Sequence, residues 1–334
     1  MPRKLIERLL QLIPVLLGIS VIVFVMITLT PGDPVEIMLG DEISSPEQEA
    51  ALRRDMGLDL PVAERFLRFL GNALKGDFGL SYYHRRPVFD VIVERLPATI
   101  ELTIVAMLVA IGTAVPLGVL AAVRKNTFLD RAATVGSMFG VSMPGFWFGI
   151  LLIMLFAVHL RLLPVAGRIG YAAEVPAITH LLLIDTLLAG QLDSFLDAAG
   201  HLMLPALTLG LSMGAILMRV TRTSMLEVLN QDYVTFAEAK GLSRLRVLGR
   251  HALKNALIPT VTVAALETGT LLGGNMIVET IFGWPGLGRL VVEGIFSRNF
   301  PLIQAAVLFY AVTYVLLNFI ADVLYTVLNP RVRL

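Results

Sequence analysis

Residues 223–259 read TSMLEVLNQDYVTFAEAKGLSRLRVLGRHALKNALIP and separate two apolar runs that are each long enough to cross a bilayer. This segment is polar, basic and composed largely of helix-forming residues. Ser224 and Glu227 have the spacing of a capping box, which predicts that a helix begins there. An ordered, charged segment between two apolar, membrane-spanning runs indicates a surface to which a soluble partner protein binds.

A first helix over 232–240 would place Tyr233, Phe236 and Ala237 on one face, because residues three and four apart are neighbours on a helix. Gly241 follows directly and is the residue type that most often ends a helix. The spacing therefore predicts a short amphipathic helix that stops at this glycine.

Ser243 predicts the start of a second helix, in which Leu245, Leu248 and Ala252 point the same way. Pro259 marks the entry to the next apolar run. The pattern predicts two short helices with apolar residues available to fill a groove in a partner. On the residues alone, basic helices lying on anionic lipid remain an alternative. A nucleic-acid-binding helix-turn-helix is disfavoured by the membrane runs on both sides.

The composition is that of an integral membrane protein. Hydrophobic residues make up 56% of the 334 residues and charged residues 16%, whereas soluble domains carry about 25% charged residues. The chain has no cysteine, which excludes disulfides, thiolate metal sites and cysteine nucleophiles. Its five histidines show no metal-binding spacing, so no metal site is expected.

The apolar runs predict an all-α protein with six transmembrane helices. The first is expected to be a retained membrane anchor, because it is longer than the apolar part of a cleavable signal peptide. The fourth is the weakest, since it contains Pro205. The short run 180–189 is expected to form a surface helix on an outer loop. The six expected spans are 9–30, 98–123, 134–158, 202–222, 257–281 and 302–327.

Basic residues predict the orientation of these spans. They cluster before the first span, between the second and third, in the 223–258 segment and at the C-terminus, which all fall on one side of a six-span topology. By the positive-inside rule this side is the cytoplasm, so both termini are expected there. The chain is then expected to divide into three parts: a tail and first span (1–30), a periplasmic region (31–97) and a core of five spans (98–334) that includes the cytoplasmic segment 223–258. Within 31–97, two capped helices are expected, over 45–57 and 61–76.

Several motifs along nearly the whole chain resemble one family. AEAKGLSRLRVLGRHALKNALIP is similar to the cytoplasmic signature loop of ABC-transporter permeases, in the form carried by the dipeptide and oligopeptide importers. The other blocks that resemble this family are PGDP (31–34), GDFGLSY (76–82), VSMPGFWFGILLIMLF (141–156), SMLEVLNQDYV (224–234), ETIFGWPGLGRL (279–290) and DVLYTVLNPRVR (322–333).

The loop departs from the pattern of the broader permease superfamily, EAA-x3-G followed by I-x-L-P. Only Ala237, Gly241 and Leu253 agree, while Thr235 stands at the Glu position. This difference resembles the peptide-importing subgroup, and it argues against sugar or amino-acid import rather than against a permease.

The resemblance implies that the helix pair 223–258 docks into a cleft of an ATPase subunit. Its contact residues would be Tyr233, Phe236, Ala237, Glu238, Lys240, Gly241 and Arg244. Ala237 and Gly241 would allow close helix approach, Glu238 and Lys240 would make polar rim contacts, and Arg244 would anchor the second helix. The partners it implies are a second homologous permease, two cytoplasmic ATPases and a periplasmic or extracellular solute-binding protein, all at a bacterial inner membrane and without nucleic acid.

Polar residues inside the apolar runs are candidates for the translocation path. Glu267 falls near the middle of the fifth expected span, where a carboxylate costs about 2.5–3.5 kcal/mol on insertion scales. It either lines the path, with Asn275 as a second candidate, or makes packing hydrogen bonds only. Glu101 lies near a span end, where water is expected to reach it, and Trp284 is expected at the membrane interface.

Nothing in the sequence supports catalysis on this chain. It contains no G-x-x-x-x-G-K-[ST], so ATP and Mg²⁺ are expected only on the partner ATPases, and no cofactor on this chain. Gly269 and Gly273 form a G-x-x-x-G and are expected to serve helix packing. The sequence thus indicates an alternating-access permease subunit for dipeptides or short peptides. The alternatives are import of nickel, glutathione or longer oligopeptides, a membrane scaffold that merely recruits a partner, and, least favoured, an ion-coupled secondary transporter.

Overall fold

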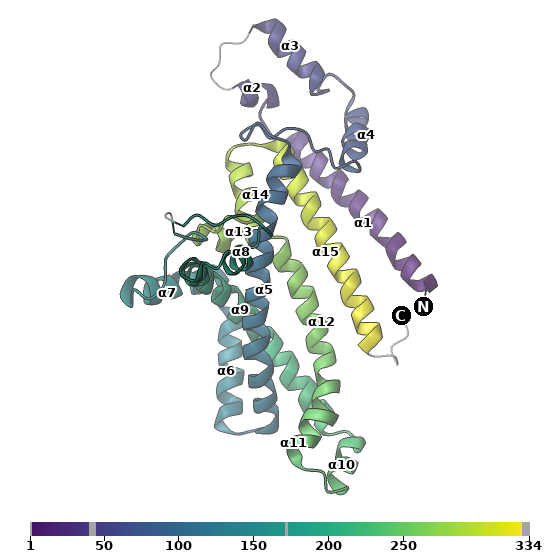
Figure 1. Cartoon of the computed structure of the whole chain (residues 1–334). Coiled ribbons are helices and arrows are strands. Elements are labelled where there is room, and N and C mark those ends of the chain that lie inside the picture. Colours follow the sequence, from purple (N-terminus) through teal and green to yellow (C-terminus); the bar gives the residue numbers. More distant parts are fainter. Residues whose placement is uncertain (1, 40–44, 171–172, 329–334) are drawn as a thin grey trace.

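The computed structural model is an elongated bundle of helices (Figure 1). It describes residues 2–39, 45–170 and 173–328, and within these ranges the regular structure is helical apart from an isolated pairing of Leu80 with Pro87. One end of the bundle carries α10 and α11 and is called the coupling end here; the opposite end, with α2, α3 and α4, is called the far end.

The longest helices form the body of the bundle. They are α1 (Pro2–Leu29), α5 (Val88–Val123), α6 (Phe128–Ser142), α9 (Leu192–Leu229), α12 (Leu253–Leu272) and α15 (Phe300–Leu328). The short elements are α2 (Pro34–Leu39), α3 (Pro46–Asp55), α4 (Val62–Ala73), α7 (Gly145–Leu152), the π-helical η1 (Ile153–His159), α8 (Leu182–Leu188), α10 (Asp232–Ala239), α11 (Arg244–Arg246), the π-helical η2 (Val247–Ala252), α13 (Met276–Ile281) and α14 (Leu287–Phe296).

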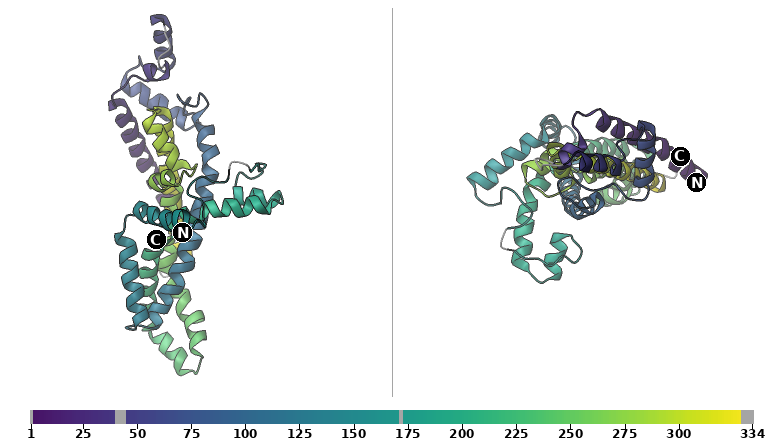
Figure 2. Two further views of the ribbon diagram at one scale, coloured as in Figure 1. Left: turned by 90° about the vertical axis from the view of Figure 1, so that its left-hand side faces the viewer. Right: turned by 90° about the horizontal axis from the view of Figure 1, so that it is seen from above.

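The expected six spans are confirmed in number, but the third is broken. Five helical segments are long and apolar enough to cross a membrane, and α6 with α7 and η1 makes a sixth if this bent pair is counted as one span. The two halves meet at 106°. Pro144 explains the break, since proline disfavours helical geometry in the residue before it, and Met143 is extended (φ −79°, ψ 132°). Consequently α7 projects from the side of the bundle (Figure 2).

Small residues hold α5 and α9 together along much of their length. A Cβ atom added to Gly210 would lie 2.6 Å from the carbonyl oxygen of Ala106, and one added to Gly118 would lie 2.8 Å from Cβ of Thr221. These glycines therefore let the two backbones approach closely, as small residues do in membrane helices. The predicted weak span 202–222 is the middle of α9, because membrane helices tolerate a proline such as Pro205.

The expected helix-packing role of Gly269 and Gly273 is confirmed. A Cβ atom on Gly269 would lie 3.5 Å from side-chain atoms of Tyr314 and Leu317 on α15, and one on Gly273 would overlap the ring of Tyr310. The two glycines thus allow α12 and α15 to pack side by side.

The helices expected near the far end are also confirmed. Ser45 caps α3 and forms a reciprocal capping box with Gln48, and Gly57 (φ +66°) follows the helix end. The second expected helix is α4, whose Phe66 and Phe69 rings pack against Phe24 of α1. The next helix, α5, begins at Val88, ten residues before the expected span, so the end of the 31–97 segment is helical.

Candidate functional site

The segment 223–258 folds as a helix pair, although its two ends differ from expectation. The predicted helix start at Ser224 is wrong, because α9 continues through this residue to Leu229. The predicted second short helix is also not separate: α11, η2 and α12 run on from Arg244 to Leu272. No strong helix breaker lies there except Pro259, which the long helix accommodates.

The turn between the two helices follows the sequence. Lys240 ends α10, and Gly241 follows with φ +76°, a left-handed conformation that favours glycine. A Cβ atom on Gly241 would meet no atom within 4 Å. The expectation that Gly241 serves close helix approach is therefore corrected, because its backbone conformation, not crowding, selects glycine here. Ser243 occupies the N-cap position of α11 in extended geometry.

The inner face of the pair is buried against the rest of the bundle. Val234, Ala237 and Val247 form a small core, with Val228 and Leu229 of α9 packed against it. Next to it, a second core joins α5, α9 and α12 and consists of Ala122, Met225, Ala252 and Ala256. The helix pair is thus braced on α9 and α5 rather than hanging from a flexible loop.

Tyr233, Phe236 and Ala237 lie within α10 at the predicted helical spacing, but they do not form one continuous apolar surface. Ala237 points inward and is 6% exposed, whereas Tyr233 is 41% and Phe236 61% exposed. The buried positions of α10 are Val234 and Ala237, and the two aromatic residues, three positions apart, lie next to each other on the more exposed side of that stripe. The Tyr233 hydroxyl accepts a hydrogen bond from Nδ2 of Asn255 (2.8 Å), which ties α10 to α12.

The outward residues of α10 and α11 combine apolar and basic groups. Phe236 is exposed beneath the Lys240 ammonium, whose Nζ lies 4.5 Å from the ring centroid. Leu245 is 84% exposed and stands between the exposed Arg244 and Arg246. We call these five residues the docking face; Glu238 is exposed beside them. Leu245 was expected to share one apolar face with Leu248 and Ala252, but Ala252 is fully buried in the bundle whereas Leu245 is exposed.

The two path candidates lie toward the other end of α12. Glu267 is partly buried and lies five residues before the helix ends at Leu272, not at mid-span as expected, because the span starts at the coupling end and is shifted toward it. The Asn275 side chain caps α13 by accepting a hydrogen bond from the Val278 backbone N–H (3.0 Å). Their role in the path remains a prediction.

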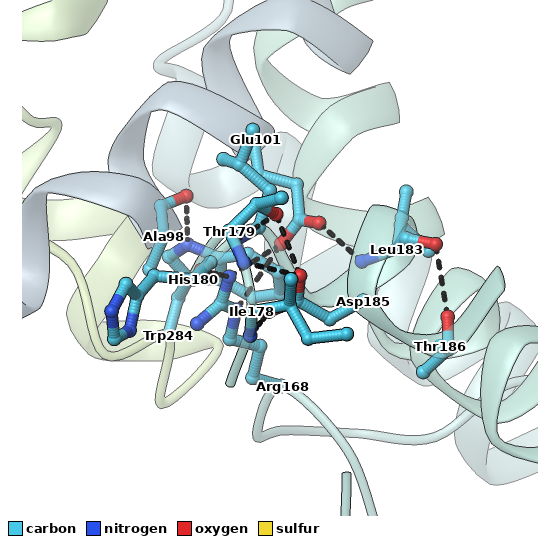
Figure 3. Close-up of polar contacts among 11 residues, drawn as sticks. Ala98, Glu101, Arg168, Ile178, Thr179, His180, Leu183, Asp185, Thr186 and Trp284 are labelled. Atoms are coloured by element: carbon cyan, nitrogen blue, oxygen red, sulfur yellow. Dashed lines mark hydrogen bonds and ion pairs between the residues drawn. The ribbon is translucent and has the colours of Figure 1, made fainter. Parts of the chain in front are cut away.

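A polar cluster that the sequence did not predict joins α5 to the 160–181 segment and α8 (Figure 3). Arg168 donates two hydrogen bonds to Oε2 of Glu101 (2.8 and 3.1 Å) and one to the His180 carbonyl oxygen. Oε1 of Glu101 accepts the Leu183 backbone N–H (2.6 Å). Glu101 is 5% exposed, so the expectation that water reaches it is wrong.

Trp284 belongs to the same region and is also not where it was expected. Its side chain is 1% exposed, and its indole N–H donates to the Ala98 carbonyl oxygen (2.9 Å). The Arg168 guanidinium lies 6.0 Å from the centre of its ring. Burial replaces the expected interfacial position because the loop before α14 folds back onto α5.

Glu279 is a buried carboxylate in the same loop region. It accepts the backbone N–H groups of Asn275 (3.2 Å) and Arg289 (3.0 Å), and a Cβ atom on Gly286 would lie 2.5 Å from its Oε2. Burial raises the pKa of Glu279 to about 7, and the backbone hydrogen bonds oppose this rise. Glu279 lies in the ETIFGWPGLGRL block, and the family resemblance of this block was the sequence signal that could have singled it out.

The described residues contain no group of three His, Asp or Glu side chains placed to hold a metal ion.

Two family models cover most of the chain. Residues 114–334 match the family described as binding-protein-dependent transport system inner membrane component, and residues 1–103 match the N-terminal part of such membrane components. The chain belongs to this family. It is a multi-pass inner membrane protein and a transport component rather than an enzyme, as the motifs predicted.

Full-length relatives agree with this assignment. The permease is 43% identical over 332 residues to the dipeptide transport system permease protein DppB of Escherichia coli K12, with 98% of each chain covered. It is 44% identical over 327 residues to the di/tripeptide transport system permease protein DppB of Pseudomonas aeruginosa (98% and 97% covered). The glutathione transport system permease protein GsiC of Escherichia coli K12 is 40% identical over 328 residues, with 98% of each chain covered.

The fold also matches a solved structure. The match is titled as an inward-facing conformation of the MetNI methionine ABC transporter, with a TM-score of 0.50, 17% identity, and 72% of this permease and 96% of that chain covered. At this identity the match concerns the fold alone. The family models and the relatives confirm the identification of an ABC-importer permease that the motifs gave.

Proposed function

We propose that this permease is half of the membrane pathway of an ATP-driven importer of dipeptides and other short peptides. The docking face carries the proposal. It exposes Phe236 and Leu245 to the outside of the bundle while Val234 and Ala237 hold the same helix pair on the body. An exposed apolar pair on an ordered support is what a hydrophobic groove in a partner binds.

The mechanism follows from the way the pair is braced. When two ATPase subunits close on ATP, α10 moves with the ATPase that holds it. Because Val234 and Val247 pack on α9, the pair moves as a rigid lever instead of bending. Two such permeases then switch between inward and outward openings, and ATP hydrolysis resets them. No bond of the cargo is made or broken on this chain.

The partners and orientation belong to the same proposal. A second homologous permease completes the pathway, two ATPases bind the two docking faces, and a solute-binding protein delivers cargo on the opposite side of the membrane. The basic residues Arg124, Lys125, Arg244 and Arg246 support a cytoplasmic coupling end. Both termini are then cytoplasmic, and the 31–97, 161–200 and 283–301 segments face the binding protein.

Dipeptides are the favoured cargo, because relatives with more than 40% identity are named for dipeptide or di/tripeptide transport. Glutathione is the second candidate, since a relative with 40% identity is named for its transport. Glu267 is proposed to line the path and to meet the ammonium group of a peptide, with Asn275 further along it. An ion-coupled carrier, by contrast, has no need of a docking face.

The test is transport by the reconstituted complex. The permease is purified with its second permease and ATPases, placed in proteoliposomes with the binding protein, and supplied with labelled dipeptide or labelled glutathione. We expect ATP-dependent dipeptide uptake that disappears when residues 232–256 are deleted from a permease that still inserts. Unchanged uptake after this deletion would refute the coupling role. Uptake of glutathione alone would refute the dipeptide assignment.

A further inference from the structure

One buried ion pair links α6 to α9 close to the coupling end. Arg222 of α9 binds both carboxylate oxygens of Asp130, with Nε 2.5 Å from Oδ1 and Nη2 3.0 Å from Oδ2. Asp130 is 3% exposed and also accepts the Asn126 backbone N–H (2.9 Å). The carboxylate therefore holds the turn between α5 and α6 as well as α9.

The position of this pair relates it to the docking face. Arg222 lies two helical turns before the end of α9 at Leu229, which packs against the core of the helix pair. The neighbouring Thr221 exchanges a hydrogen bond with Thr260 of α12 (Oγ1–Oγ1 3.0 Å) and touches α5 at Gly118. At this level the bundle therefore joins α5, α6, α9 and α12, close to the support of the helix pair.

Apolar contacts also join α6 to its neighbours. At the end farther from the coupling end, Gly140 approaches α9 so closely that an added Cβ atom would lie 2.8 Å from Cβ of Ala215. At the other end α6 is held by Asp130, and between the two ends Ala133 packs against the core of α5 and α9. An apolar pocket of about 690 Å³ opens beside these contacts, with Gly136 and Met218 in its lining. The ion pair is thus a directional polar link added to non-directional apolar packing.

We propose that Asp130 and Arg222 form a transmission clamp, which carries the displacement of the coupling helices to α6 and through it to α7 and η1, the other half of the broken third span. This inference rests on the proposed function. A bidentate guanidinium–carboxylate pair fixes orientation as well as distance, so it transmits rotation and translation of α9 to α6. The apolar contacts between the two helices have no such directional preference, so the ion pair fixes how α6 follows α9.

The clamp predicts that ATP hydrolysis and peptide transport become partly uncoupled when the ion pair is removed. In the assembled complex, D130N and R222Q remove the bidentate pair, and each should lower the amount of peptide imported per ATP hydrolysed by roughly 3- to 30-fold. The double variant should be no worse than the more severe single variant, because both remove the same link. R222K keeps the charge but loses the planar fork, so an intermediate ratio is expected. The matched control is R131Q, an exposed arginine beside Asp130, which should leave the ratio unchanged.

A second measurement follows the movement of α6 and does not depend on which cargo the permease transports. The permease has no cysteine, so spin labels are placed on introduced cysteines at Met138 of α6 and Leu316 of α15, which are both exposed. ATP should change the distance between the labels in the otherwise unchanged permease. D130N, or R222K if D130N assembles poorly, should reduce that change.

The outcomes distinguish a transmitting role of the ion pair from a purely stabilising one. They also distinguish failure of the clamp from failure of the proposed function. If the variants lower the amount of complex but leave the import per ATP and the label movement unchanged, the pair only stabilises the fold and the inference is overturned. An equal effect of R131Q, or no ATP-dependent movement of α6 in the starting permease, also overturns it. If α6 moves with ATP but no peptide is imported, the cargo assignment fails while the movement still tests the clamp.

Discussion

The docking face predicts that one exposed phenylalanine supplies much of the affinity for the ATPase. A phenylalanine side chain buries about 200 Å² when fully covered. Phe236 is 61% exposed, so a partner groove would cover about 120 Å² of it. At about 25 cal/mol per Å², this contact stabilises the complex by about 3 kcal/mol. F236A should therefore weaken ATPase binding about 100-fold.

The assay measures binding of the purified ATPase to the permease pair in detergent over a range of ATPase concentrations. Binding is detected either on surface-immobilised permease or by sedimentation. Phe236 contributes little to the fold, because its ring lies outside the core of Val234, Ala237 and Val247, so the variant should remain folded. F296A is the matched control: Phe296, at the end of α14, is 85% exposed and lies outside the docking face. It should leave ATPase binding unchanged. An F236A permease that binds the ATPase with wild-type affinity, or an equal loss in F296A, would refute the assignment of the docking face.

Three further predictions concern buried or partly buried carboxylates. E101Q leaves Arg168 without its ionic partner and should lower the free energy of unfolding by about 3–5 kcal/mol, measured by denaturant unfolding in detergent. The double variant E101Q/R168M should recover part of this loss. An unchanged unfolding midpoint in E101Q would contradict the prediction. The pKa of Glu279 is about 7 in the folded permease and 4.5 ordinarily, so its contribution to the free energy of unfolding is complete below pH 4.5 and is lost as the pH rises through 7, by up to about 3 kcal/mol. The unfolding midpoint of E279Q should therefore depend less on pH than that of the starting permease. Equal pH dependence of the two midpoints would count against this. E267Q should impair peptide uptake while the complex still assembles, and normal uptake would remove Glu267 from the path.

Hydropathy and glycine chemistry predicted most of the fold. The apolar runs identified the membrane helices, and Gly241 was correctly predicted to end α10. The bend after Ser142 was missed because hydropathy averages over the S-M-P-G sequence and reads one continuous run. Pro205 was given too much weight, since α9 continues through it.

Residues whose environment is set by distant parts of the chain could not be predicted. Glu101 and Trp284 looked like residues at the edge of the membrane, but both are covered by loops. Arg168, which pairs with Glu101, is 67 positions away in the sequence, and no local pattern connects the two. Asp130 and Arg222 are 92 positions apart, and no local pattern connects them either. The inward face of α10 was missed for a related reason, because it depends on how far α9 extends.

The length of α9 explains how one docking event can reach several helices. Its 38 residues span about 57 Å, so the helix reaches from the support of the coupling helices into the body of the bundle. Along this length it holds α10 through Leu229, α6 through Arg222, α12 through Thr221 and α5 through the closely packed Gly210. A flexible connection would absorb a displacement within the first turn, whereas a rigid element with fixed contacts passes it to each neighbour in turn. The contacts differ in kind: α5 is held by backbone proximity along many residues, whereas α6 adds the bidentate Asp130–Arg222 pair to its apolar contacts with α9. We therefore expect α5 to move with α9 as one body, and the coupling of α6 to be the one that a single substitution weakens most.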